Sequence, residues 1–262
     1  MKFFIFTDLE GVAGVDRFIQ TIDDDLELKE PSMKQLAREV NACIEGILSA
    51  DGHAVIDVWD GHGYGGLHED DLVHGRYIAS DSTPYFDLRG YDAAMFVGQH
   101  AMEGTFNAPL SHTYWPENIS YYRLNGSFIG EFAARTLVAG DQGVPVIFLS
   151  GDDKAAIEAK MFVPGIETAI TKLGTGLESA VLLSREEACS RIRSGSANAV
   201  KRMADIPPFR GFSAPYRFEA RFFKRETAES QMAASLVKNR DAKYLDERTI
   251  EIVTDDLSNL PF

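Results

Sequence analysis

Four short apolar runs without strict polar alternation limit the folds that this chain can adopt. The runs are four to six residues long and cover residues 3–6, 54–59, 93–97 and 144–149. Runs of this length and pattern are typical of strands buried on both faces, as the strands of a parallel sheet are. We therefore expect an α/β fold with a parallel sheet at its core.

Helical spacing of apolar residues is found between these runs. Ser32 and Gln35 have the spacing of a capping box, and apolar residues recur at helical spacing from Met33 to Ile47. Together with the first two apolar runs, this helix makes a βαβ unit. Further helices are expected over residues 127–138, 152–161 and 184–203. In the first of these, Phe128 is expected to face the interior.

The pattern changes after Pro207–Pro208. Residues 216–222 alternate with period two, which is typical of a half-exposed strand in an antiparallel sheet. A helix is predicted over 226–237 and a final strand over 250–254. We therefore expect two parts, an α/β domain over residues 1–205 and a smaller α+β section over 206–262 that packs on it.

The chain has 26 basic and 40 acidic residues among 262, which gives a net charge of −14. A surface this acidic repels phosphate backbones and anionic lipid heads, so nucleic acid and membranes are not expected as partners.

Cys43 and Cys189 lie far apart and indicate neither a disulfide framework nor a zinc knuckle. The apolar run at residues 3–6 is too short for a signal peptide, and no run approaches the length of a spanning helix, so a cytoplasmic protein is expected.

Acidic or imidazole side chains follow all four apolar runs. Asp8 and Glu10 follow the first run, His62 the second and His100 the third, while two aspartates follow the fourth. The carboxyl ends of parallel strands lie at one edge of a sheet, where ligands bind in open α/β folds. Two neighbouring carboxylates repel each other unless a proton or cation lies between them, and imidazole is the commonest side-chain ligand of metals. The sequence therefore predicts a divalent metal site at this edge.

Two further residues are candidates on weaker grounds. His112 follows Ser111 in a loop after His100, and with metals nearby it is the candidate for acid–base chemistry. Glu131 lies inside the helix expected over 127–138, where a carboxylate must be paired, metal-bound or exposed. From position alone, His112 could equally be a hydrogen-bonded core residue, and Glu131 a solvated helix residue.

The order of these residues resembles that of the M55 peptidases, the D-aminopeptidase family. The matching motifs are Asp8-x-Glu10-Gly11, Asp60-Gly61-His62, Gly98-x-His100-Ala101, Ser111-His112 and Gly130-Glu131, and the segment from Gly151 to Lys154 also fits the family. Five spaced motifs in one order are far more specific than any single motif. The likeness extends from residue 1 to about residue 160 and continues more weakly to the C-terminus.

The resemblance implies a zinc aminopeptidase with two Zn²⁺ ions per subunit, acting on short peptides with an N-terminal D-residue, typically D-alanine. It also implies a homo-oligomer, in the typical member a ring of ten subunits. His112 matches the family's catalytic histidine. The positions that match its metal ligands are Asp8, Glu10, His62, His100 and Glu131. Because these ligands mix nitrogen and oxygen, manganese and cobalt remain alternatives to zinc.

The expected chemistry is hydrolysis by a water that two metals activate between them, with Asp8 as the bridging carboxylate. His112 is expected either to transfer a proton or to stabilise the developing oxyanion. Two alternatives remain open from the sequence. One is another binuclear metal hydrolase, such as an amidase or phosphoesterase, and the other is a non-catalytic, metal-stabilised ring that binds peptides.

Overall fold

The computed structural model describes residues 1–262, and a seven-stranded sheet forms its larger layer. In chain order, the strands are β1 (Lys2–Thr7), β2 (Val55–Trp59), β3 (Arg76–Ile78), β4 (Ala93–Gln99), β7 (Val146–Asp152), β8 (Glu167–Gly176) and β9 (Ser179–Leu182). Their order across the sheet is β3-β2-β1-β4-β7-β8-β9, and all neighbours are parallel except β8 and β9. The four apolar runs form the adjacent strands β2, β1, β4 and β7, so the predicted parallel α/β core is confirmed.

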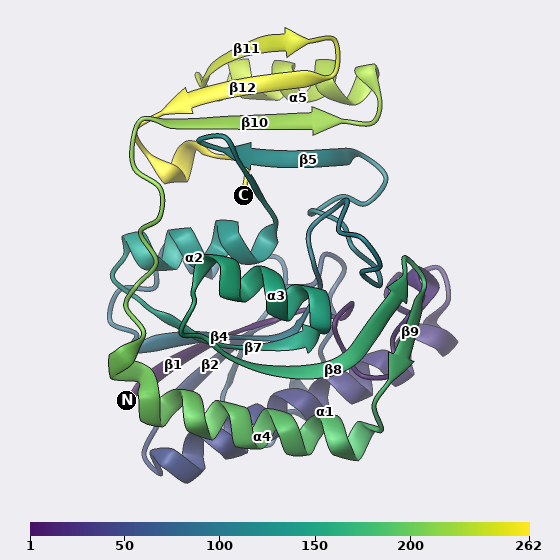
Figure 1. Cartoon of the computed structure of the whole chain (residues 1–262), viewed down its shortest axis with the longest axis vertical. Helices are drawn as coiled ribbons and strands as arrows, with labels where there is room; N and C mark the ends of the chain where they lie inside the picture. Colours follow the sequence, from purple (N-terminus) through teal and green to yellow (C-terminus); the bar gives the residue numbers. More distant parts are fainter.

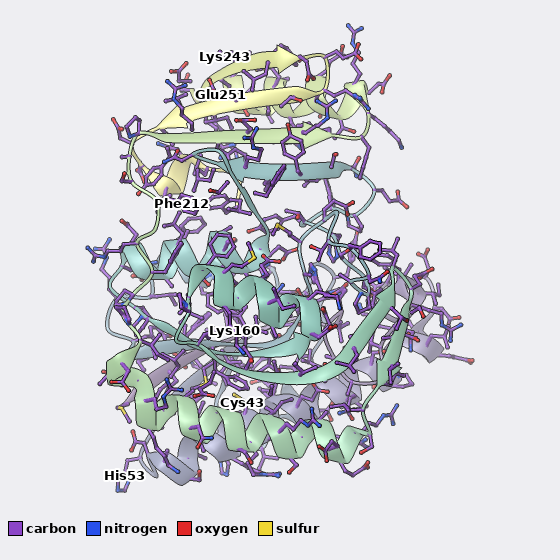
Figure 2. The ribbon with its side chains drawn as sticks, in the orientation of Figure 1. Cys43, His53, Lys160, Phe212, Lys243 and Glu251 are labelled. Carbon is purple, nitrogen blue, oxygen red and sulfur yellow. The ribbon has the colours of Figure 1, made fainter.

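Helices cover both faces of this sheet (Figure 1). On one face lie α1 (Leu26–Ala50) and α4 (Arg185–Arg202), which pack against each other. On the other face lie α2 (Glu131–Asp141) and α3 (Asp153–Phe162). Cys43 is fully buried where α1 packs on β4 (Figure 2), and both cysteines of the chain are free. None of the helices has a stretch long and apolar enough to cross a membrane.

A second, antiparallel sheet lies beyond α2 and α3, on their side away from the main sheet (Figure 1). Its strands are β5 (Ile119–Leu124), β6 (Ser127–Ile129), β10 (Tyr216–Phe222), β11 (Asp241–Asp246) and β12 (Thr249–Thr254), and α5 (Arg225–Val237) packs on it. The strand order is β11-β12-β10-β5-β6, so the antiparallel strand predicted over 216–222 is confirmed. Because β5 and β6 precede residue 205, this sheet takes strands from both sides of the predicted boundary. The division of the chain at residue 205 stays a prediction.

Helix α2 lies between two hydrophobic cores. Phe132 belongs to the core of the main sheet, whereas Leu137 packs with Phe218 in the core of the second sheet. Phe212, in the segment that joins α4 to β10, lies between the layers (Figure 2), with its ring centre 5.9 Å from that of Phe209. The two layers are therefore joined by apolar packing as well as by the chain.

Side-chain caps decide where the helices begin. Asp152 caps α3 and Ser184 caps α4, at the starts of the helices expected over residues 152–161 and 184–203. The predicted start of α1 at Ser32 is wrong. The helix begins at Leu26, because the Asp25 side chain accepts a hydrogen bond from a first-turn N–H and caps it.

A hairpin replaces the start of the helix predicted over residues 127–138. Asn125 and Gly126 both have positive φ, which is the usual conformation of an Asn-Gly hairpin turn, and they connect β5 to β6. The helix therefore begins only at Glu131. Phe128 lies on β6 and is 55% exposed, so the prediction that it faces the interior is wrong.

Candidate metal centre

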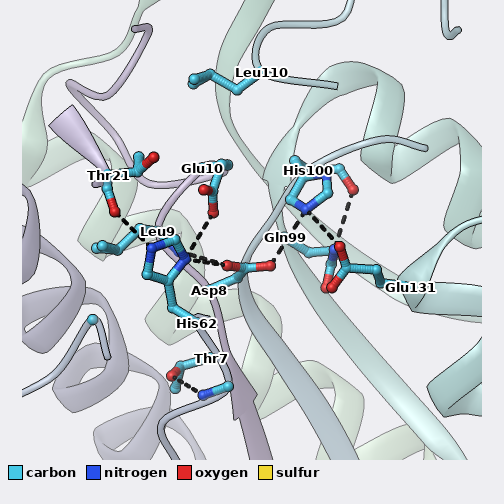
Figure 3. Close-up of polar contacts among 12 residues, drawn as sticks. Thr7, Asp8, Leu9, Glu10, Thr21, His62, Gln99, His100, Leu110 and Glu131 are labelled. Carbon is cyan, nitrogen blue, oxygen red and sulfur yellow. Dashed lines mark hydrogen bonds and ion pairs between the residues drawn. The ribbon is translucent and has the colours of Figure 1, made fainter. Parts of the chain in front are cut away.

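Three neighbouring strands bring four of the predicted site residues to the carboxyl edge of the main sheet (Figure 3). Asp8 and Glu10 follow β1, His62 follows β2 and His100 follows β4. Because β1 lies between β2 and β4, Asp8 lies between the two imidazoles. Its Oδ1 is 3.1 Å from Nδ1 of His62, and its Oδ2 is 3.4 Å from Nε2 of His100. Oε2 of Glu10 is 3.2 Å from the same Nδ1 of His62.

Glu131 approaches the same point from the first turn of α2. Its Oε1 lies 3.4 Å from Nε2 of His100 and 3.7 Å from Nε2 of His112. Glu131 is the first residue of the helix, after Gly130, rather than a solvated residue within it. A Cβ at position 130 would lie only 2.6 Å from Cβ of Met102, so glycine lets the helix start come this close. All six predicted site residues are buried, none more than 7% exposed.

The donor set fits divalent metal ions better than it fits hydrogen bonding. Ligand atoms of Asp8, Glu10 and His100 lie within 4.8 Å of one another, as do those of His100, His112 and Glu131. Oε2 of Glu10 and Nε2 of His100 are buried and make no hydrogen bond. Buried polar atoms nearly always have a partner, and a cation among these atoms would supply one. Mixed imidazole and carboxylate ligands are those that zinc and similar ions take.

Backbone carbonyls fix the tautomer of each imidazole in the centre. Nε2 of His62 is 2.7 Å from the carbonyl of Thr21, and Nδ1 of His100 is 2.9 Å from that of Ala101. Nδ1 of His112 is likewise 2.9 Å from a carbonyl, that of Leu110. A carbonyl only accepts, so each of these nitrogens carries the proton in the neutral ring. The lone pairs are left on the nitrogens that face the carboxylates, as in metal-binding histidines.

Burial and neighbouring carboxylates set the charges of the imidazoles. Burial disfavours the charged form of His62, but Glu10 and Asp8 outweigh this effect and hold the pKa of His62 well above its usual value. Burial lowers the pKa of His112, and the neighbouring His100 lowers it further. His112 is therefore neutral near pH 7 in the metal-free protein, which suits a group that accepts a proton.

The centre lies at the buried end of a cavity of about 810 Å³. His112 lines this cavity, and its ring stacks on that of His100 with 3.9 Å between ring centres. Tyr64 and Trp115 also line the cavity and are 71% and 52% exposed, which places them at its mouth. A small molecule entering past these aromatic side chains would meet His112 and the proposed ligands together.

Two buried cationic side chains support the centre, and neither is among the residues predicted from the sequence. Arg135 lies one turn after Glu131 on α2, and its Nη2 is 3.0 Å from Oε2 of that residue. Lys172 of β8 is fully buried, and its Nζ donates to the backbone carbonyls of Glu10 and Val12 in the loop after β1. The spacing of Arg135 from Glu131 is the only pattern that could have suggested either role.

The other polar residues at the strand ends have structural roles. Asp60 accepts a hydrogen bond from Gly66 N–H at 2.8 Å and so shapes the loop that carries His62. Asp152 caps α3 through its side chain. The remaining histidines are exposed, and they are His53, His68 and His74.

Nearly the whole chain matches one family of peptidases. The model of the peptidase M55 family, described as D-aminopeptidase, matches residues 1–260. The chain belongs to the M55 peptidase family. The D-aminopeptidase of Bacillus subtilis (strain 168) is 28% identical in an alignment over 216 residues, and the match covers 79% of this chain and 77% of that protein. The solved structure of the Zn-dependent D-aminopeptidase DppA from Bacillus subtilis, a self-compartmentalizing protease, matches with a TM-score of 0.88 at 23% identity and covers 98% of this chain and 93% of that chain.

These comparisons confirm the family resemblance and the α/β fold, and they identify this M55 protein as a peptidase, hence a hydrolase. Zinc dependence and self-compartmentalization are stated for DppA. The roles of individual residues in the M55 chain described here remain predictions, which the geometry of the centre supports.

Proposed function

We propose that this M55 protein is a zinc aminopeptidase that removes an N-terminal D-amino acid, such as D-alanine, from short peptides or amides. The observation that carries the proposal is the convergence of ring nitrogens from three histidines with three carboxylates at the buried end of one cavity. Membership of the D-aminopeptidase family supports the reaction, and the Zn-dependent DppA supports the metal.

Five residues are the proposed ligands of two ions per chain. Asp8, Glu10 and His62 would hold one ion, and Asp8, His100 and Glu131 the other. The position of Asp8 supports this division, because its Oδ1 faces His62 and its Oδ2 faces His100. Bound zinc would polarise the scissile carbonyl and bring the pKa of a water to about 7. The same ligands also suit manganese and cobalt.

His112 is the proposed acid and base. Its Nδ1–H donates to the Leu110 carbonyl, so its lone pair is on Nε2. Because burial keeps this ring neutral and the ring lines the cavity, Nε2 can accept a proton during attack by water. The protonated ring can then return that proton to the departing amine or stabilise the oxyanion.

The charges that line the cavity favour a substrate with a free N-terminal ammonium. Besides the proposed ligand carboxylates, Asp23, Asp24 and Glu117 line the cavity. Arg135 is its only arginine or lysine, and that side chain is already paired with Glu131. Outside the proposed metal ligands, a phosphate ester would therefore meet carboxylates and no unpaired lysine or arginine, which disfavours the phosphoesterase alternative.

Assembly into a homo-oligomer, with a ring of ten subunits as the expected form, is part of the proposal, as is a cytoplasmic location. The match to DppA, a self-compartmentalizing protease, supports assembly. Analytical ultracentrifugation at micromolar concentration tests it, and a monomer under these conditions would contradict it.

The test of the function combines metal analysis with a substrate panel. Protein purified without chelator or added metal should contain two zinc ions per chain by elemental analysis. It should then cleave D-alanyl amide and D-alanyl peptides faster than their L-isomers. Protein that contains no divalent metal and takes up none on titration would contradict the ligand assignment. A metal-loaded protein that cleaves neither isomer would contradict the proposed reaction.

A further inference from the structure

Arg135 adjoins the proposed metal centre, although the proposed chemistry gives it no role. It lies one turn after Glu131 on α2, with its Nη2 3.0 Å from Oε2 of Glu131. We infer that Arg135 is a positioning residue, which holds Oε2 of Glu131 so that only Oε1 serves as a metal ligand. The inference rests on the proposed two-metal centre and extends it, because it makes one of the two ions depend on Arg135.

The two oxygens of Glu131 have different neighbours. Oε2 faces Arg135, whereas Oε1 accepts a hydrogen bond from the Tyr114 N–H at 2.8 Å. Oε1 is also the oxygen that faces Nε2 of His100 and Nε2 of His112. The carboxylate is therefore held at both oxygens, and it cannot turn to offer both of them to one ion without breaking the ion pair.

Aromatic rings, rather than further carboxylates, hold the guanidinium of Arg135. Its central carbon lies 5.1 Å from the ring centre of Trp59, 5.5 Å from that of Tyr114 and 6.0 Å from that of Tyr85. Arg135 is only 4% exposed, and its Nε and Nη1 have no hydrogen-bond partner. A buried guanidinium requires a counter-ion, and Glu131 is the only carboxylate paired with this one. Separating the pair is therefore unfavourable, and Glu131 stays in one orientation.

Only one of the proposed ligand carboxylates, that of Glu131, is paired with a lysine or arginine side chain. Asp8 and Glu10 face imidazoles, and neither forms an ion pair with a lysine or arginine side chain. The ion proposed between His100 and Glu131 should therefore depend on Arg135. The ion proposed at Glu10 and His62 should not.

Removing Arg135 removes both its charge and its hold on Glu131, and these two losses should change the metal affinity in opposite directions. A guanidinium repels a nearby metal ion, so loss of its charge alone would tighten metal binding. Loss of positioning would free the Glu131 carboxylate to rotate and would weaken binding. Residues that hold a metal ligand in place typically contribute about 10- to 100-fold to metal affinity. The direction of the change therefore separates the two effects.

The experiment is a Co²⁺ titration of the metal-free protein, followed by visible absorption and by equilibrium metal content. Wild-type protein should take up two ions per chain. Arg135→Met should bind one ion with unchanged affinity and the other about 10- to 100-fold more weakly. Its one-ion spectrum should match that of Glu131→Gln. Arg135→Lys keeps the positive charge but lacks the planar guanidinium, so it should restore part of the affinity for the weakened ion.

Arg191→Met is the matched control. Arg191 pairs with Glu187 at the same i, i+4 spacing, 2.8 Å apart, on the exposed side of α4, so this variant should bind both ions as wild-type protein does. The double variant Glu131→Gln/Arg135→Met leaves no buried charge without its partner. If Arg135 acts through Glu131, this double variant should bind metal no more weakly than Glu131→Gln alone.

The inference is overturned if Arg135→Met binds both ions with wild-type affinity, binds either ion more tightly, or loses both ions to the same extent. Should Arg135→Met fail to fold, Arg135→Lys decides by the same titration. That variant should weaken the ion that Glu131→Gln loses and leave the other unchanged. Wild-type protein that takes up fewer than two ions would instead contradict the proposed two-metal function, so the two failures are distinguishable.

Discussion

Three histidines at the carboxyl edge of the main sheet differ in how close they come to carboxylates. Nδ1 of His62 and Nε2 of His100 each approach two carboxylates within 3.4 Å. Nε2 of His112 approaches only Glu131, at 3.7 Å, and its ring lies against that of His100. His112 is thus beside the proposed ligands and on the cavity wall, which is where a proton-transfer group must be.

Replacing His112 by alanine separates catalysis from metal binding. We expect kcat for D-alanyl amide to fall by about 10²- to 10⁴-fold, the usual contribution of general acid–base catalysis, with two metals per chain retained. Steady-state kinetics and elemental analysis of the same preparation measure both. Loss of one ion in His112→Ala would make His112 a ligand, together with His100 and Glu131. His53→Ala is the control, because His53 is exposed and precedes β2 while His62 follows it.

Residues differ in how far the sequence alone can identify them as part of the centre. The four residues at strand ends could be predicted, because apolar runs without polar alternation indicate parallel strands and the carboxyl ends of such strands lie at one edge. His112 and Glu131 follow none of the predicted strands, so position alone made them weaker candidates, and their roles were predicted only through the family resemblance. Arg135 looks like any helical arginine until its burial is known. Thr21 and Leu110 contribute only carbonyl oxygens, which no pattern of side chains reveals.

Among the structural elements, the ends of β1, β4 and β7 approach each other closely enough to require glycine. A Cβ on Gly98, which has a φ of +84°, would lie 2.0 Å from the backbone oxygen of Asp8. A Cβ on Gly151 would lie 1.9 Å from the backbone oxygen of Gln99. The contact at Gly98 sets the distance between β1 and β4, and therefore between Asp8 and His100, and the contact at Gly151 sets the distance between β4 and β7. Gly98 and Gly151, which both belong to the sequence motifs of the family, therefore allow the backbones of neighbouring strands to approach closely.

Gly98→Ala should destabilise the protein by about 3 kcal/mol or more, because positive φ and the contact with the Asp8 backbone both oppose a Cβ. Urea unfolding of metal-free protein measures the free energy of unfolding. Gly63→Ala is the matched control, since a Cβ there would meet nothing within 4 Å, and it should change the free energy by less than about 0.5 kcal/mol. Equal stability of the two variants would show that the strand ends can separate freely.

A buried carboxylate connects α1 to the loop that carries Glu10. Glu39 accepts hydrogen bonds from Ala13 N–H at 2.8 Å and from the Gln35 amide at 3.1 Å, and burial raises the pKa of Glu39 to about 7. When the pKa of a carboxyl group is higher in the folded than in the unfolded protein, its contribution to the free energy of unfolding is fully present at pH values below the unfolded pKa. That contribution is lost as the pH rises from the ordinary value of 4.5 to about 7.

The glutamine in Glu39→Gln cannot ionise, so the stability of this variant should not fall in this pH range as that of wild-type protein does. Relative to wild-type protein, the variant should gain stability between pH 5 and pH 8, by roughly 3 kcal/mol at most. The measurement is the difference in unfolding free energy between variant and wild type at each pH, in metal-free protein. A difference that is the same at both pH values would mean that Glu39 is ionised throughout.

Elements were predicted well where burial or capping makes their pattern clear, and poorly elsewhere. The four central strands have apolar runs, interrupted only by Asp57 in β2, and α3 and α4 begin at strong caps. The edge strands β3, β9 and β11 were missed, because their side chains are mostly exposed or half-buried and lack the core pattern. The β5–β6 hairpin has a clear Asn-Gly turn at 125–126, but the apolar residues that follow it also fit a helix.

At the scale of the whole molecule, the second sheet shows what local patterns leave open. The period-two pattern of residues 216–222 predicts an antiparallel strand but not its partners. One partner is β12, nearby in sequence, and the other is β5, with Phe218 opposite Leu124. That pairing places the second sheet over α2, whose first residue is Glu131. Long-range pairing of this kind depends on the packing of the complete chain. The boundary at residue 205, which rests on a local change of sequence pattern, therefore did not predict it.

The proposed ligands come from four separate segments, those of Asp8 and Glu10, His62, His100 and Glu131, which only the folded chain brings together. An ion that binds only the folded state at 100 times its Kd adds about 2.7 kcal/mol per site. For a chain of this size, that corresponds to about 5–10 °C in Tm. Chelation should therefore lower Tm by at least this amount, and zinc should restore it, as measured by calorimetry. His62→Ala, which lacks one ligand, should show a smaller shift. A Tm that chelation leaves unchanged in zinc-loaded protein would mean that the metals do not bridge these segments.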